Sequence, residues 1–191
     1  MPNVSAKAEP AGIESLKALK SSLAVRAKIA SSLRRAFEAA AFIETETPVG
    51  IFAPAAEEYI EAPKAASFFL RTSPELQMKR LLAAGMERIY QLGPCFRAGE
   101  NGRRHRPEFT MLEYYMTGAD YLELLDFTRG FLASICSDLY GSHRFRFGEN
   151  TIDIDKLEII PVREAFRRFA NEDADRCAEE DARFEFVLVD R

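Results

Sequence analysis

Apolar positions near the start of the chain repeat at helical spacing and predict an amphipathic helix from Leu23 onward. Basic residues fill the positions between them, and the apolar members of the stripe are Val25, Ile29, Leu33 and Phe37. Residues 1–20 contain prolines and a glycine and show little apolar periodicity, which predicts a flexible N-terminal lead-in. We therefore expect the folded domain to occupy residues 21–191.

A strand is predicted over residues 42–47, closed by Pro48, and a second helix is predicted further along the chain. The segment Thr72–Glu75 offers a hydroxyl side chain for capping, a proline at the first helical position and an acid in the first turn. Because these residues suit the exposed N–H groups of a helix start, we expect a helix here. It should continue to Ala84 and end at Gly85.

Two extended runs, residues 88–97 and 108–116, are separated by a polar, arginine-rich segment and predict a β-hairpin with a long loop. Because side chains alternate along a strand, each run presents one set of residues to each face of the hairpin. One predicted face holds Gln91, Gly93, Cys95 and Arg97 together with Phe109, Met111, Glu113 and Tyr115.

This predicted face combines an aromatic ring, a guanidinium group, a carboxylate and a phenol. These groups suit a nucleotide together with an amino acid, since a ring can stack on a base, a guanidinium can hold phosphate and a carboxylate can hold an ammonium group. On spacing alone, an ordinary half-buried sheet with a solvated basic loop accounts for the same pattern. Cys95 beside Phe96 is explained more simply as a small apolar filler than as a nucleophile.

A third helix is predicted to follow the hairpin. Asp120 and Glu123 resemble a capping box, and an apolar stripe at helical spacing continues from there. Beyond it, the pattern predicts a strand over residues 151–154, a helix over residues 161–170 and a final apolar run over residues 184–189. The expected fold class is therefore α+β, an antiparallel sheet with flanking helices.

Composition narrows the picture further. A chain of 191 residues, 47% of them hydrophobic, can bury one sizeable core. The net charge of -4 gives no general attraction to nucleic acid, so contact with phosphate would depend on the arginines at 97, 103, 104 and 106. The cysteines lack metal-ligand spacing, which fits a reducing cytosol. No apolar run approaches the roughly 20 residues of a membrane span, so we expect a cytoplasmic protein with no membrane partner.

The order of residues in three blocks resembles the catalytic domain of class II aminoacyl-tRNA synthetases of the lysyl type. Residues 96–100 (Phe-Arg-Ala-Gly-Glu) and 104–113 (Arg-His-Arg-Pro-Glu-Phe-Thr-Met-Leu-Glu) look like motif 2 of that class. Residues 72–81 resemble the segment just upstream, and the predicted first helix with Pro48 is similar to motif 1. The resemblance implies an enzyme, a ligase, that uses ATP to activate lysine or β-lysine as an adenylate.

The resemblance also implies roles for individual residues. Arg97 would be catalytic, holding the α-phosphate of ATP and the carboxylate of the amino acid. The ATP site would comprise Arg97, Glu100, Arg104, His105 and Phe109, with the Phe109 ring stacked on adenine. The amino-acid site would comprise Ser73, Glu75, Gln91, Glu113 and Tyr115. Pro48 and the helix before it would belong to the interface of a homodimer.

Three features favour the elongation factor P (R)-β-lysine ligases within this resemblance. Gly99 replaces the family's usual acid, with Glu100 one place later, and Gln91 stands where lysine–tRNA ligases tend to carry an acid. Only about 22 residues precede the motif 1 helix, too few for an anticodon-binding barrel. We therefore expect transfer to a lysine of elongation factor P. The alternatives are lysine–tRNA ligase, with tRNA as acceptor, and a non-catalytic paralogue that keeps part of the ATP site.

A counterpart of the family's motif 3 does not follow Glu113 in this sequence. We therefore expect a class II domain truncated before motif 3, with the ligands of Mg²⁺ beyond residue 191 and none within the chain. The 191-residue chain alone should then bind ATP weakly at best and form no adenylate. Whether α-lysine or β-lysine is preferred, and whether Arg191 is the natural end, stays open.

Overall fold

The structure, a computed structural model, describes residues 12–180 and residue 184 of the chain. The chain divides into two units, residues 1–152 and residues 153–191. Residues 1–11 of the expected lead-in, and residues 185–189 of the final apolar run, lie outside the described residues.

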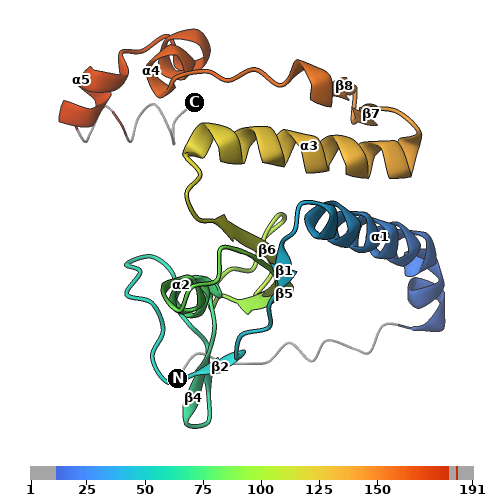
Figure 1. Ribbon diagram of the computed structural model, residues 1–191, viewed down its shortest axis with the longest axis vertical. Coiled ribbons are helices and arrows are strands. Elements are labelled where there is room, and N and C mark those ends of the chain that lie inside the picture. The colour runs from blue at the N-terminus through green and yellow to red at the C-terminus, as the bar shows by residue number, and fades with distance from the viewer. Residues whose placement is uncertain (1–11, 181–183, 185–191) are drawn as a thin grey trace. The chain divides into compact units, whose positions relative to one another are not determined.

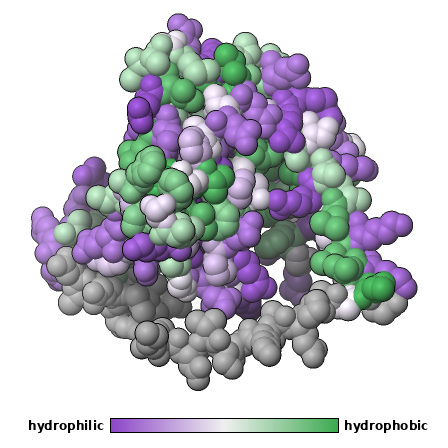
Figure 2. All heavy atoms as spheres, turned by 90° about the horizontal axis from the view of Figure 1, so that it is seen from below, coloured by the Kyte–Doolittle hydropathy of each residue, from purple (hydrophilic) through white to green (hydrophobic). Residues whose placement is uncertain are grey.

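The first helix, α1 (Ile13–Ala39), begins before Leu23, the first position of the predicted stripe. Helix α1 therefore starts inside the segment that we expected to be a lead-in. The pattern missed this part because its apolar side chains stay exposed (Figure 2) and form no buried stripe. In the second half of α1, Leu33 and Phe37 are buried, as the stripe predicts.

The first unit contains a three-stranded sheet in the order β1-β5-β6. Strands β5 (Arg88–Phe96) and β6 (Glu108–Met116) pair antiparallel along their whole length, which confirms the predicted hairpin. Strand β1 (Ile43–Glu44) pairs with β5 in parallel, so the sheet is mixed rather than wholly antiparallel. β1 is shorter than predicted: the backbone N–H of Thr45 still donates to the Tyr90 carbonyl of β5, but that of Thr47 donates to the side chain of Gln91 rather than to the backbone of β5.

A second small sheet, in the order β2-β4-β3, is built from the segment between β1 and β5. Its strands are β2 (Gly50–Ile51), β3 (Lys64–Ala65) and β4 (Phe68–Leu70), and both pairs are antiparallel. Helix α2 (Glu75–Ala83) confirms the helix predicted here, with Pro74 at the N-cap rather than at the first helical position. The chain leaves α2 at Gly85, whose φ of 99° is a conformation that glycine adopts most readily.

Helix α3 (Tyr121–Tyr140) runs beside α1 (Figure 1). It begins with the predicted capping box, in which Asp120 accepts from the backbone of Glu123 and the Glu123 side chain accepts from the Asp120 backbone at 2.9 Å. This arrangement satisfies N–H groups that have no partner inside the helix. α3 ends at Gly141, which has a left-handed φ of 67°.

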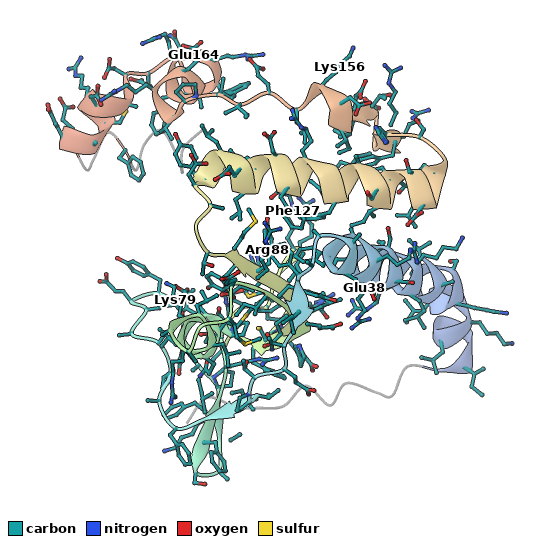
Figure 3. All side chains as sticks on the ribbon, viewed as in Figure 1. Glu38, Lys79, Arg88, Phe127, Lys156 and Glu164 are labelled. Carbon is teal, nitrogen blue, oxygen red and sulfur yellow. The ribbon has the colours of Figure 1, made fainter. Side chains whose placement is uncertain are left out.

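The core of the first unit is largely aromatic. Its buried members come from α1, the turn after α1, β5 and α3, and they are Leu33, Phe37, Phe42, Tyr90 and Phe131. The Phe37 ring centroid lies 4.6 Å from that of Tyr90 and 5.0 Å from that of Phe127. Figure 3 shows Phe127 on the side of α3 that faces Arg88. These contacts bury one face of the hairpin against α1 and α3.

A short hairpin, β7 (Arg144–Phe147) with β8 (Asn150–Asp153), follows α3, and β8 confirms the strand predicted near residues 151–154. The described elements of the second unit are η1 (Ile154–Lys156), α4 (Val162–Ala165), the π-helical η2 (Phe166–Ala170) and α5 (Ala174–Glu179). The helix predicted over residues 161–170 is thus present, with a change to π geometry midway. None of the described helices has both the length and the apolar character needed to cross a membrane.

Candidate functional site

The hairpin has a closed face and an open face. In the observed register, Gln91 pairs with Glu113, Gly93 with Met111 and Cys95 with Phe109. Directly paired residues in antiparallel strands point to the same side of the sheet. The open face is therefore formed by Gln91, Gly93, Cys95, Phe109, Met111, Glu113 and Tyr115. The closed face, formed by Tyr90, Leu92, Leu112 and Tyr114, contributes Tyr90 to the core, with Leu112 and Tyr114 packed against it.

Arg97 lies at the loop end of the open face, as predicted. Its guanidinium carbon is 5.2 Å from the centroid of the Phe109 ring, within the range of a cation–π contact. One guanidinium nitrogen, Nη1, is 3.7 Å from a carboxylate oxygen of Glu100. The Nε atom is buried and has no hydrogen-bond partner. A buried charged donor without a partner favours an anion at this end of the open face.

The loop after Arg97 carries the predicted basic residues. The backbone N–H of Ala98 donates to the carbonyl of Glu61 at 2.8 Å, which anchors the start of this loop to the segment before β3. Arg104 and His105 are exposed, and within the described part of the chain no side-chain hydrogen bond or ion pair joins them to Arg97. The structure therefore brings Glu100 and Phe109 to Arg97, and it shows no such contact of Arg97 with Arg104 or His105 among the described residues.

Glu113 is the centre of the other end of the open face. One of its carboxylate oxygens accepts from Ser73 Oγ at 2.7 Å, and the other accepts from the Tyr115 hydroxyl at 2.5 Å. Ser73 Oγ in turn accepts from the backbone N–H of Glu75 at 3.1 Å. Burial first, and then the bond to Glu113, raises the pKa of Tyr115, so its hydroxyl remains a donor at neutral pH. Three predicted amino-acid residues thus meet here.

Glu75 and Gln91 take other partners. The Glu75 carboxylate forms an ion pair with Lys79 one turn along α2. Gln91 lies opposite Glu113 in the register and is 3% exposed, and its Oε1 accepts from Thr47 Oγ1 at 2.9 Å. Glu75 is thus oriented along its own helix, whereas Gln91 lies on the open face itself.

Sequence reasoning missed two residues of this region, Arg71 and Thr47. Arg71 is 1% exposed, and Thr47 is also buried. Arg71 donates to the carbonyls of Pro94 and Thr47, and Thr47 donates to Gln91. The sequence did contain a signal, because Arg71 directly follows the apolar run Phe68–Leu70. A charged side chain so close to a core is expected to be hydrogen-bonded.

Cys95 is buried on the open face, with its Sγ 4.0 Å from Met111 Sδ. Burial is the main cause of a pKa that is raised above the usual value of the thiol. A raised pKa keeps the sulfur protonated at neutral pH, which makes it a poor nucleophile. This supports the interpretation of Cys95 as an apolar filler.

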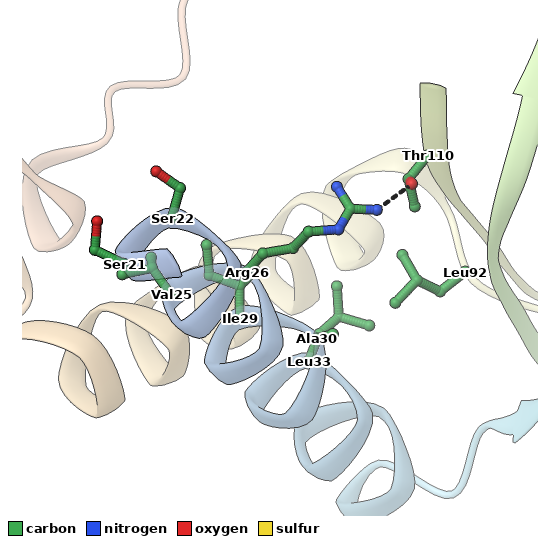
Figure 4. Close-up of a pocket in the computed structure, with 9 residues that line it drawn as sticks. All are labelled: Ser21, Ser22, Val25, Arg26, Ile29, Ala30, Leu33, Leu92 and Thr110. Atoms are coloured by element: carbon green, nitrogen blue, oxygen red, sulfur yellow. Dashed lines mark hydrogen bonds between the residues drawn. The ribbon is translucent and has the colours of Figure 1, made fainter. Parts of the chain in front are cut away.

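The predicted interface residue Pro48 is exposed. A cavity of about 600 Å³ lies elsewhere, between α1 and the closed face of the hairpin, and Figure 4 shows its lining. Val25, Ile29 and Leu92 line it, and Arg26 Nη2 donates to Thr110 Oγ1 at 2.5 Å across it. Because it lies on the side away from Glu113, this cavity is separate from the open face.

No group of three or more His, Cys, Asp and Glu side chains that could hold a metal ion occurs among the described residues. Glu113 accepts from two hydroxyl groups, Glu75 pairs with Lys79, and Glu100 lies beside Arg97.

Comparison with known proteins shows to which family the chain belongs. The family model for tRNA synthetases class II (D, K and N) matches residues 12–190, so the chain belongs to that family. It is similar to the protein named lysine–tRNA ligase from Shewanella denitrificans, at 36% identity over 156 residues, 78% of this chain and 31% of that protein.

Two further relatives carry the same name. The lysine–tRNA ligase of Actinobacillus pleuropneumoniae serotype 5b is 37% identical over 153 residues, 77% of this chain and 31% of that protein. That of Shewanella piezotolerans is 40% identical over 135 residues, 68% of this chain and 27% of that protein. The chain thus spans less than a third of the length of these curated relatives.

Proposed function

We propose that this protein activates lysine with ATP as a lysyl adenylate, in the manner of a lysine–tRNA ligase. The observation that carries the proposal is the pair of sites at opposite ends of one open face, an anion site at Arg97 and a carboxylate at Glu113. An amino acid with a side-chain ammonium group needs both. The similarity to proteins named lysine–tRNA ligase supports the same substrate, with tRNA as acceptor.

The ATP end of the proposed site is Arg97 with Phe109. The unpartnered Nε of Arg97 fits an oxygen of the α-phosphate, and the Phe109 ring offers a surface for adenine. We assign Glu100, beside Arg97, and the loop residues Arg104 and His105 to the same nucleotide. The loop residues are exposed, so we expect them to order against the outer phosphates on binding.

The lysine end of the proposed site is Glu113. With hydroxyl donors from Ser73 and Tyr115 on its two oxygens, the carboxylate is held in place and still has lone pairs for an ammonium group. We assign Glu75 and Gln91 to the same pocket. Arg97 would then hold the substrate carboxylate as well as phosphate, neutralising charge where the acyl phosphate forms.

The test of the proposal is amino-acid-dependent exchange of pyrophosphate into ATP, measured with a form of the protein extended through motif 3. Lysine should support exchange, and norleucine, which has nearly the same shape but no side-chain ammonium group, should not. Exchange that is equal with both amino acids, or present only with an acidic one, would contradict the lysine assignment.

Elongation factor P ligation is the second candidate, and Gln91 is the observation that favours it. Gln91 is a neutral residue paired in register with Glu113, at a position where the resemblance leads us to expect an acid in lysine–tRNA ligases. The acceptor would be a lysine of elongation factor P, and the activated amino acid lysine or β-lysine. With radiolabelled lysine and β-lysine, label in tRNA supports the first candidate and label in elongation factor P supports the second.

We further propose that the protein is a cytoplasmic homodimer that pairs through α1 and Pro48. The support is the exposed apolar stripe of α1, which includes Val25 and Ile29. Sedimentation at micromolar concentration should give about twice the monomer mass. A monomer that persists at higher concentration would instead indicate that the stripe packs within one chain.

A further inference from the structure

Arg71 carries a buried positive charge without a carboxylate partner. Its side chain is 1% exposed, and within the described part of the chain no ion pair involves it. A buried guanidinium is destabilising unless its N–H groups are bonded. Here Nε donates to the Pro94 carbonyl at 2.9 Å, and Nη1 donates to the carbonyl and Oγ1 of Thr47 at 2.7 and 3.1 Å. Arg71 thus joins the end of β4 to β5 and to the segment after β1 by directional bonds.

Gly93 leaves the space that Arg71 occupies. A Cβ atom added at Gly93 would lie 2.9 Å from Arg71 Nη2, closer than real Cβ atoms approach. That Cβ would point to the open face, because Gly93 pairs with Met111. The Arg71 guanidinium therefore lies against the open face at Gly93, between Gln91 and Cys95 on the same strand.

Thr47 transmits the position of Arg71 to Gln91. The Thr47 hydroxyl accepts from Arg71 and donates its single hydrogen to Gln91 Oε1 at 2.9 Å, and the Thr47 backbone N–H donates to the same oxygen at 3.1 Å. Because a backbone N–H can only donate, it requires the oxygen, not the nitrogen, of the amide on its side. The amide of Gln91 can therefore have only one orientation.

This orientation decides what Gln91 offers. Its Nε2 lies 3.6 Å from the position of a Cβ on Gly93, on the open face, and makes no hydrogen bond to a described residue. Gln91 thus presents N–H donors opposite Glu113, which is an acceptor. Arg71 is also separated only by Thr72 from Ser73, whose hydroxyl donates to Glu113. Both sides of the amino-acid pocket are therefore connected to Arg71.

We propose that Arg71 is a positioning residue for the amino-acid end of the site, acting through Thr47 on the Gln91 amide and requiring Gly93 for its own place. The inference rests on the proposed function for its readout in catalysis. It assigns no direct contact between Arg71 and substrate. Its consequence is that changes at Thr47 and Gly93, which carry no chemistry themselves, alter amino-acid binding while leaving ATP binding unchanged.

Matched variants test this in the pyrophosphate-exchange assay. Thr47→Val keeps the shape and the backbone N–H but removes the hydroxyl relay, whereas Thr47→Ser keeps the relay. Misplacement of a binding group by about 1 Å costs up to about 100-fold, so KM for lysine should rise about tenfold in Thr47→Val and about 10- to 100-fold in Gly93→Ala. KM for ATP should stay within about twofold, and Thr47→Ser should restore KM for lysine.

A merely structural role would give a different result. General loosening of the fold would change both KM values together, lower the midpoint of thermal unfolding and affect Thr47→Ser and Thr47→Val alike. That pattern would overturn the inference. Arg71→Lys, which keeps the charge but not the planar fork, should behave as Gly93→Ala does.

The amide itself gives a readout that does not need catalysis. The chain has two glutamines, Gln77 on α2 and Gln91, so selective ¹⁵N labelling yields two side-chain NH₂ signals. We expect the chemical shifts of the Gln91 NH₂ signals to change in Thr47→Val, because Oε1 of the same amide loses a donor, and those of Gln77 to stay unchanged. Unchanged Gln91 shifts in Thr47→Val overturn the inference by themselves. Absence of pyrophosphate exchange with every amino acid, in a form of the protein extended through motif 3, overturns instead the proposed function.

Discussion

The two faces of one hairpin differ in what their side chains do. The closed face packs rings and methyl groups against α1 and α3, around Phe37. The open face carries a carboxylate and an amide that are held by hydrogen bonds, and the Arg97 guanidinium over the Phe109 ring. Both faces belong to the same two strands, so the difference between the faces arises only from the alternation of side chains along each strand. Stability should therefore depend on the closed face and activity on the open face.

Replacing Phe37 by Ala tests the closed face. The Phe37 ring is fully buried and contacts five other rings. Loss of such a ring costs about 3–5 kcal/mol, so the free energy of unfolding in urea should fall by that amount. In the fraction that stays folded, KM for lysine should be close to that of the native protein. A loss of less than about 1 kcal/mol would mean that the core is centred elsewhere.

Replacing Arg97 by Ala tests the open face. Removing one well-placed donor to developing charge typically costs about 100- to 1000-fold in rate, so exchange activity should fall by at least that factor. The free energy of unfolding should change by no more than about 1 kcal/mol, because Arg97 is outside the core. Arg97→Lys should not restore activity, since an ammonium group lacks the planar fork. An active Arg97→Ala protein would remove Arg97 from the site.

Replacing Tyr115 by Phe tests the support of Glu113. The change removes one hydroxyl donor from the carboxylate and leaves the ring. A hydrogen bond to a charged group contributes about 1.5–3 kcal/mol, so KM for lysine should rise about tenfold or more. KM for ATP serves as the internal control. If KM rises for ATP and not for lysine, the amino acid does not bind at Glu113 as we propose.

The smallest expected effect concerns Glu44, at the edge of the sheet. Its hydrogen bond with Arg34 is the main cause of a pKa below the usual value. A lowered pKa in the folded state contributes stability above the unfolded pKa, and this contribution is lost as pH falls through the folded value. Because the pair is partly exposed, the effect should be below about 1 kcal/mol. Unfolding of Glu44→Gln, compared with the native protein at pH 7 and pH 3, measures it.

Local patterns were sufficient for the long elements. The alternation along 88–96 and 108–116 predicted the hairpin, and the capping residues Asp120 and Glu123 predicted the start of α3. These features depend on neighbours a few residues apart, which a sequence displays directly. The first part of α1 was missed because its apolar residues are exposed, so that no buried stripe marks it.

The pattern predicted the neighbours in the candidate site, whereas the roles of the residues stay a prediction. Alternation placed Phe109, Glu113 and Tyr115 on one face, as the register has them, and Arg97 lies beside Phe109. The pairing of Glu75 with Lys79, and of Arg97 with Glu100, was beyond the reach of the pattern. Those outcomes depend on rotamers and on the course of the loop, which period-2 alternation does not specify.

The sequence by itself determined which residues can share a face of the hairpin, where α3 begins and to which family the chain is similar. Only the tertiary structure decided that Arg71, from the end of β4, lies under Gly93 and holds Gln91 through Thr47. These four residues come from three separate segments, so no local spacing connects them. The physical reason is that a buried charge requires acceptors wherever the fold supplies them, and that choice is made when the segments pack.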